Sequence, residues 1–161
     1  MLSRLKIILL VSFTLIYYHC NNSIDISKVE VVFNDKKAFF KKNSKAYSGI
    51  IIEHYDDGKV KMEMVVLNGF KDGIFKQFHI NGNLQTQSHF VEGKIHGKFA
   101  SYHLSGNEQI LTFYNNNHRH GSYEEFHENG KLKICGNYYM GMRIGEFYEY
   151  FKSGGIAIYN Y

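Results

Sequence analysis

Apolar and polar residues of this chain follow a pattern that repeats every 24 residues from Gly49 onward. Two columns of glycine mark the period, nine residues apart: Gly49, Gly73, Gly97, Gly121 and Gly145, then Gly58, Gly82, Gly106, Gly130 and Gly154. A third column holds Gly69, Gly93 and Gly141, with Asn117 in the remaining place. Asn is the residue that best replaces glycine in a left-handed conformation. Such a period predicts an array of small repeated units instead of one compact domain.

The apolar residues keep the same register. One column holds Ile51, Phe75, Phe99, Tyr123 and Phe147, a second holds Phe78, Tyr102, Phe126 and Tyr150, and the return segment carries Val66, Phe90, Tyr114 and Tyr138. Pairs such as Asn81-Gly82 separate the apolar runs, which is the strongest short signal for a β-hairpin. Phe75 and Phe78 are three residues apart, so strict alternation places them on opposite faces, and a bulge or an early bend would bring them together.

Each copy therefore predicts strand, turn, strand and connector, and the chain as a whole predicts an all-β fold. We expect five 24-residue β-hairpin repeats, at 49–72, 73–96, 97–120, 121–144 and 145–161. Residues 21–48 are expected to be a linker with a degenerate N-terminal cap hairpin, formed by Val29 to Phe33 and Ala38 to Phe40. The last copy is expected to place the strand at Ile156 to Tyr161 at an open sheet edge.

The N-terminal stretch is typical of an export signal. Arg4 and Lys6 precede an uncharged, mostly apolar run from Ile7 to Tyr18, which is shorter than the roughly 20 apolar residues that span a bilayer. Cys20 and the polar residues after it resemble a bacterial lipoprotein signal, although Tyr18 and His19 stand where small residues are usual. We expect residues 1–20 to be a signal peptide, Cys20 to be lipidated, and the protein to be exported and anchored in the bacterial cell envelope, facing the periplasm or the surface. Simple cleavage and an uncleaved anchor are the alternatives.

Composition and motifs argue against several classes of function. The formal net charge of +4 is too small for a nucleic-acid footprint, and the two cysteines provide no disulfide framework once Cys20 is used by the signal. His79, His103 and His127 share a column, but two strands per repeat separate them by roughly 10 Å, too far to share an ion. The loop residues His96, His118 and His120 are expected to be ordinary connector residues. No catalytic motif is present, so we expect no enzyme activity, no metal and no cofactor.

The unit G-x-F-x-x-F-H-x-N-G-x-L, present from Gly73 to Leu84 and again from Gly121 to Leu132, resembles the MORN repeat variant. The chain is similar to the bacterial YwqK-type family, whose members are commonly labelled antitoxins. The resemblance covers Gly49 to Tyr161 and implies an elongated, single-layer antiparallel sheet of tandem hairpins that serves as a binding or scaffolding surface. It brings no catalytic residues.

A single-layer sheet cannot cover both of its faces, so aromatic side chains are expected to stay partly exposed and to bind a partner. The candidate binding face comprises Phe75, Phe78, Phe99, Tyr102, Tyr123, Phe126, Phe147 and Tyr150. We expect the partner to be a protein or a peptide, held by surface complementarity. An antitoxin-like or immunity-like protein that neutralises a partner toxin is the first alternative, and a binder of cell-wall glycan is the second.

Overall fold

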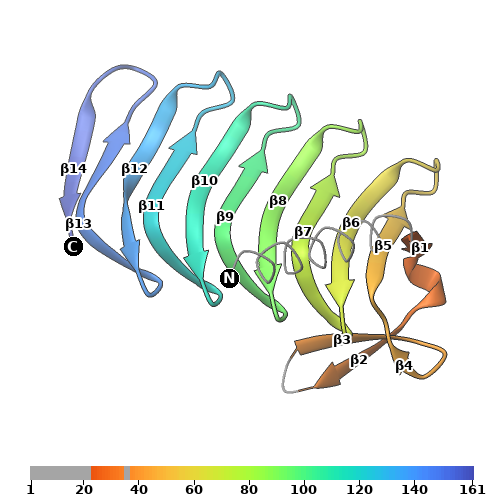
Figure 1. Cartoon of the computed structure of the whole chain (residues 1–161). Helices are drawn as coiled ribbons and strands as arrows, with labels where there is room; N and C mark the ends of the chain where they lie inside the picture. Colours follow the sequence, from red (N-terminus) through yellow and green to blue (C-terminus); the bar gives the residue numbers. More distant parts are fainter. Residues whose placement is uncertain (1–22, 35–36) are drawn as a thin grey trace, which may run out of the picture.

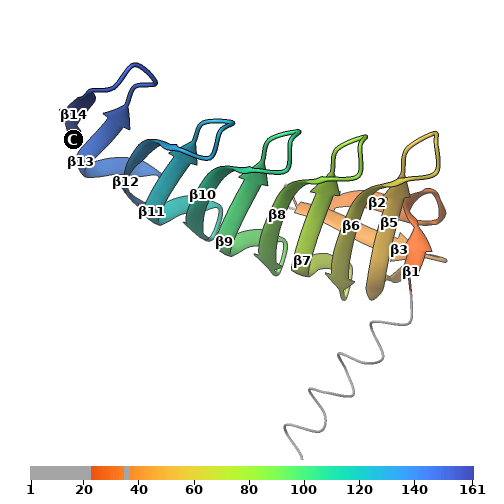
Figure 2. The same cartoon turned by 90° about the horizontal axis from the view of Figure 1, so that it is seen from above.

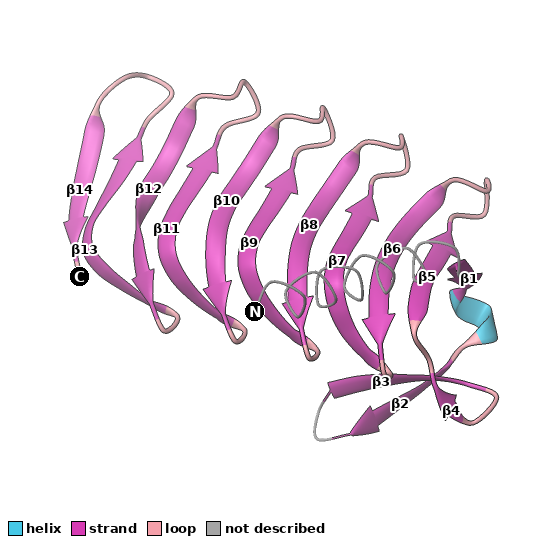
Figure 3. Ribbon diagram, viewed as in Figure 1, coloured by secondary structure: helices cyan, strands magenta, loops and turns pink. Residues whose placement is uncertain are grey.

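The computed structural model describes residues 23–34 and 37–161, in which the repeats form one elongated sheet of 11 strands (Figure 1). The elements are β1 (Ser23–Asp25), the 3-10 turn η1 (Ile26–Lys28), β2 (Glu30–Asn34), β3 (Lys37–Lys42), β4 (Lys45–Ala46), β5 (Gly49–His54), β6 (Val60–Leu67), β7 (Phe70–Phe78), β8 (Leu84–Val91), β9 (Lys94–Tyr102), β10 (Glu108–Asn115), β11 (His118–Phe126), β12 (Leu132–Tyr139), β13 (Met142–Tyr150) and β14 (Ile156–Asn160). Strands β5 to β14 follow one another in chain order, each antiparallel to the next, and β1 adds to β5 in parallel. The predicted all-β array is confirmed (Figure 3).

The glycine of each hairpin turn is required by its backbone conformation. In the first copy the N–H of Gly58 donates to the carbonyl of Tyr55 (2.9 Å), and the N–H of Tyr55 donates to the carbonyl of Lys59 (2.8 Å). This is a type I turn closed by a left-handed residue, and the five glycines of this column have φ between 80° and 94°. A side chain at that angle is strained, which explains why the column is invariant along the chain.

The connectors between repeats are also tight hairpin turns. Leu67 pairs with Phe70 across Asn68 and Gly69, whose φ angles of 50° and 85° make a type I′ turn. Asn117 replaces glycine with φ 72°, and its Oδ1 accepts a hydrogen bond from the N–H of Ile95 (2.7 Å). Because both ends of each strand from β6 to β13 close tightly, strands β5 to β14 form one continuous meander.

Register fixes which aromatic residues share a face. In β7 and β8, Phe75 pairs with Ser88 and Gln77 with Thr86, and then Phe78 pairs with Leu84, so the extra residue is Gln85. The bulge therefore lies in the partner strand, β7 keeps its alternation, and Phe75 and Phe78 lie on opposite faces. The hairpin of β13 and β14 has no bulge, which moves Tyr161 to the place that continues the column of Tyr138.

One face carries a row of aromatic pairs, which we call the aromatic face. Its rings meet edge to face at centroid distances of 5.7 Å for Phe75 and Phe90, 5.7 Å for Phe99 and Tyr114, 5.5 Å for Tyr123 and Tyr138, 5.5 Å for Tyr138 and Phe147, and 5.4 Å for Phe147 and Tyr161. Small residues lie beneath the rings: Ser88 and Thr112 are buried, and a Cβ on Gly136 would lie 2.6 Å from the ring of Phe147. These contacts form the core of the later repeats.

A second, three-stranded sheet of β2, β3 and β4 covers the aromatic face at the first repeat. Its Phe40 and the neighbouring Tyr47 are buried against Ile51, Met64 and Val66, in a cluster that extends to Phe75. Strand β3 runs across the connector end of the large sheet (Figures 1 and 2), where the N–H of Phe40 donates to the carbonyl of Gly69 (2.7 Å). The hairpin at 30–42 thus packs over the array and does not extend it.

The predicted signal peptide and its Cys20 lie outside the described residues. Among residues 23–34 and 37–161, no helix reaches the length and hydropathy needed to cross a bilayer.

Side chains join each repeat to the next on the hairpin-turn side. The Nε2 atoms of His79, His103 and His127 lie 3.0, 3.1 and 3.2 Å from the carbonyl oxygens of Tyr102, Phe126 and Tyr150, each in the following repeat. In the first copy, the hydroxyl of Tyr55 takes the same place and donates to the carbonyl of Phe78 (2.6 Å). The histidine column therefore links each repeat to the next by a hydrogen bond.

We expect His103→Phe to lower the free energy of unfolding by about 1 kcal/mol, because the carbonyl of Phe126 loses its donor. His103→Tyr is the matched control and should retain most of the stability, since Tyr55 already makes this contact. Urea unfolding of both variants measures the difference. Equal stability of the two variants would show that the hydrogen bond contributes nothing.

The close contact at Gly136 gives a second test of packing. We expect Gly136→Ala to lower the free energy of unfolding by about 1–3 kcal/mol, because the added methyl group overlaps the Phe147 ring. In a Phe147→Leu background the same substitution should cost clearly less, since the ring is gone. An identical cost in both backgrounds, measured by urea unfolding, would contradict the packing.

Candidate functional site

The aromatic face carries a row of cations at its connector end, one in each of three repeats. Lys71 Nζ lies 4.6 and 5.1 Å from the ring centroids of Phe75 and Phe90. Arg119 lies 5.3 and 5.4 Å from those of Tyr123 and Tyr138. Each cation thus lies over one aromatic pair, and the ring faces attract its positive charge.

The last repeat has the same geometry. Arg143 lies 4.7 and 5.2 Å from the ring centroids of Phe147 and Tyr161. Its Nε donates to the Tyr138 hydroxyl (3.3 Å) and its Nη1 to the Tyr161 hydroxyl (2.7 Å). A hollow of about 250 Å³ lies beside these groups, with Arg143, Phe147 and Tyr161 among its lining residues. The pair of Phe99 and Tyr114 in the third repeat differs, because the preceding position in register with the three cations is Ile95.

The cations are not neutralised within the described chain. The ion pairs found there join His54 to Asp25, Lys59 to Asp57, Lys61 to Glu53 and Lys133 to Glu125, and none involves the three cations on the aromatic face. Burial lowers the pKa of Lys71. Burial opposes the charge of Arg119, but the interactions with the Tyr114 and Tyr138 hydroxyls together outweigh it, so the pKa is raised. The three cations therefore have no carboxylate within ion-pair distance, although Glu125 accepts a hydrogen bond from the Tyr123 hydroxyl (2.9 Å) and Glu149 lines the hollow beside Arg143.

The residues of the predicted binding face divide between the two faces of the sheet. Phe75, Phe99, Tyr123 and Phe147 lie on the aromatic face, where Tyr123 and Phe147 are buried and the other two are half-buried. Phe78, Tyr102, Phe126 and Tyr150 are half-buried on the opposite face. The structure does not bring the two columns together, because the strands that carry them keep their alternation.

Several residues of the aromatic face were not in the predicted set. They are Phe90, Tyr114, Tyr138 and Tyr161 and the cations Lys71, Arg119 and Arg143. The signal for the cations was available in the 24-residue period, since positions 71, 119 and 143 are in register. That they lie over the rings depends on the connector turn and could not be deduced from spacing alone.

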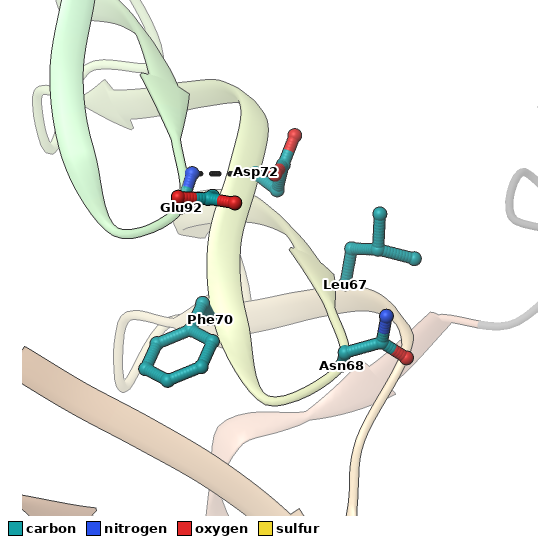
Figure 4. Close-up of a pocket in the computed structure, with 5 residues that line it drawn as sticks. All are labelled: Leu67, Asn68, Phe70, Asp72 and Glu92. Atoms are coloured by element: carbon teal, nitrogen blue, oxygen red, sulfur yellow. Dashed lines mark hydrogen bonds between the residues drawn. The ribbon is translucent and has the colours of Figure 1, made fainter. Parts of the chain in front are cut away.

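A notch of about 320 Å³ lies between the first two connector turns (Figure 4), lined by Leu67, Asn68, Phe70, Asp72 and Glu92. The Asp72 carboxylate accepts a hydrogen bond from the backbone N–H of Glu92 (3.2 Å). Two carboxylates are too few ligands for a metal ion, and within residues 23–34 and 37–161 no group of three or more His, Cys, Asp or Glu residues is placed to hold one.

Comparison with known proteins identifies the repeat. The family model of the MORN repeat variant matches residues 71–92 and 119–138, which lie largely in the second and fourth copies. No curated protein matches the sequence. A solved structure described as the crystal structure of GtfA/B complex bound to UDP and GlcNAc aligns with 82% of this chain and 24% of that chain, at 12% identity and a TM-score of 0.30. A likeness at this level indicates nothing about function.

MORN repeats are in general non-catalytic modules for binding or scaffolding. The resemblance to YwqK-type antitoxins and the lipoprotein signal stay predictions. The tandem hairpins, the glycine turns and the two matched segments together identify this chain as similar to the MORN repeat variant family in its second and fourth repeats.

Proposed function

We propose that this chain is a binding module of the bacterial cell envelope, and that the open part of its aromatic face holds an extended protein or peptide partner. The observation that carries the proposal is the row of half-buried rings beyond the first repeat. In the first repeat, the three-stranded N-terminal sheet covers the equivalent positions. In the second and third repeats, the rings of Phe75, Phe90, Phe99 and Tyr114 remain half-buried on a sheet of one layer. Exposed aromatic rows of this kind are typical of interaction surfaces.

The ring geometry favours a protein partner over a glycan. Sugars stack on the open flat face of an aromatic ring, but here each pair meets edge to face, with interplanar angles of 68° for Phe75 and Phe90 and 64° for Phe99 and Tyr114. Cations already lie over the pairs of repeats two, four and five. Such a surface offers ring edges and positive charge, which suit a peptide chain.

The proposed location rests on the sequence of residues 1–20, which carries the order of charges and apolar residues of an export signal. With Cys20 lipidated, only residues 21–22 would separate the lipid anchor from β1, so the array would lie next to the membrane. The binding face would then meet partners in the envelope and not in the cytoplasm. This location makes an envelope extract the right source of a partner.

Crosslinked affinity capture from the envelope tests the proposed function with two matched tyrosine variants. Tyr114→Ala removes a half-buried ring from the aromatic face, and Tyr102→Ala removes a half-buried ring from the opposite face of the same repeat. We expect Tyr114→Ala to weaken the captured complex at least about tenfold and Tyr102→Ala to change it less than about twofold. Both variants must first show the unfolding profile of a folded array. Loss of the complex with Tyr102→Ala alone would place the interface on the other face.

A further inference from the structure

We propose that the partner held by the aromatic face is an acidic segment in the polyproline II conformation, which runs along the axis of the array and makes one turn per repeat. This inference rests on the proposed function and names the chemistry of the partner. Three independent features of the face support it: its period, its rings and its cations.

The period of the array matches this conformation. Two strands per repeat, each about 4.8 Å wide, advance the face by about 9.6 Å. A polyproline II helix has three residues per turn and a rise of 3.1 Å, so it advances about 9.3 Å per turn. An extended β-strand points residues i and i+3 to opposite sides, and an α-helix advances only 5.4 Å per turn. Polyproline II alone among these presents the same side to every repeat.

The rings supply the apolar part of the recognition. Grooves lined by aromatic side chains bind polyproline II segments, because such a segment has no internal hydrogen bonds and loses little entropy on binding. On this face an aromatic pair recurs in each of repeats two to five, and the half-buried pairs of Phe75 with Phe90 and Phe99 with Tyr114 leave ring surface accessible, as does the exposed Tyr161. Proline or other apolar residues of the partner would lie on these pairs.

The cations define where the partner carries its carboxylates. Arg119 and Arg143 are one repeat apart, so they match carboxylates three residues apart, and Lys71 lies two repeats before Arg119, which corresponds to six residues. Ile95, in the intervening repeat, matches an apolar residue. The guanidinium of Arg143 has five N–H donors and uses two in the bonds to Tyr138 and Tyr161, so donors remain for a carboxylate.

The partner should therefore contain acidic residues at relative positions 1, 7 and 10 and an apolar residue at position 4. The cations have no carboxylate partner within the described chain, so an acidic segment would supply the missing charge. Complementary charge of this kind sets specificity and register more than affinity.

Fluorescence anisotropy with labelled decapeptides tests the inference on the purified chain. The probe contains Glu at positions 1, 7 and 10 and Pro elsewhere, and a second probe has the same spacing in reverse order, because the peptide can bind in either direction. The tighter of the two peptides is then compared with two controls. In one, Gln replaces every Glu, and in the other, the two Glu that are three residues apart are placed only two residues apart. We expect the neutral and the mis-spaced peptides to bind at least about tenfold and about threefold more weakly, respectively.

A double variant, Arg119→Gln with Arg143→Gln, links this binding to the aromatic face. It should weaken the Glu peptide about tenfold and leave the Gln peptide unchanged. Lys76→Gln with Lys98→Gln removes the same charge from the opposite face and should change binding less than twofold. Equal binding of the Glu and Gln peptides, or of correctly spaced and mis-spaced ones, would overturn the acidic polyproline II partner, as would no binding at all. In each case the proposed function would still be decided by the capture experiment with Tyr114→Ala and Tyr102→Ala.

Discussion

A sheet of one layer has no opposing layer on which to bury its apolar side chains, and this constraint shapes the whole structure. The chain satisfies it by ring contacts within each hairpin, and the contact of Tyr138 with Phe147 joins the last two hairpins. Rings of the aromatic face pack edge to face on their neighbours, with Thr112 and Gly136 leaving space beneath them. Edge-to-face pairs contribute about 0.5–1.5 kcal/mol each beyond their buried area, so many such contacts are needed. The 24-residue period follows, since each copy must form its own ring pair at the same place.

Under the same constraint, the proposed binding would use the side chains that stabilise the sheet. At the first repeat the N-terminal sheet covers the rings, and in the fourth and fifth repeats Arg119 and Arg143 lie over them. Before the third repeat the position in register with these arginines is Ile95, and the pair of Phe99 and Tyr114 stays half-buried. The rings of this middle pair are therefore open to a partner, as is the exposed Tyr161 at the C-terminal edge. A partner bound there would bury the ring surface that a sheet of one layer leaves exposed.

The sequence predicted the array well because its turns are local. Gly58 and its equivalents need left-handed backbone, and Asn117 replaces glycine where the sequence predicted, so strand number and turn position followed from spacing. The faces were harder to predict. The bulge at Gln85 lies in the strand opposite Phe78, and the missing bulge in the last hairpin shifts Tyr161 onto Phe147, neither of which has a local sequence signal. The role of the histidine column was also missed, because a hydrogen bond from His79 to Tyr102 joins residues 23 positions apart.

Site-specific photocrosslinking tests the central claim, that the partner binds the aromatic face, most directly. A benzophenone amino acid at Ile95 reports on the middle of the aromatic face, and the same amino acid at Ile74, whose side chain is 47% exposed on the opposite face, is the control. Irradiation in the cell envelope is expected to join one discrete partner to position 95 and none to position 74. Crosslinks from position 74 alone, or equal labelling from both positions, would contradict the claim.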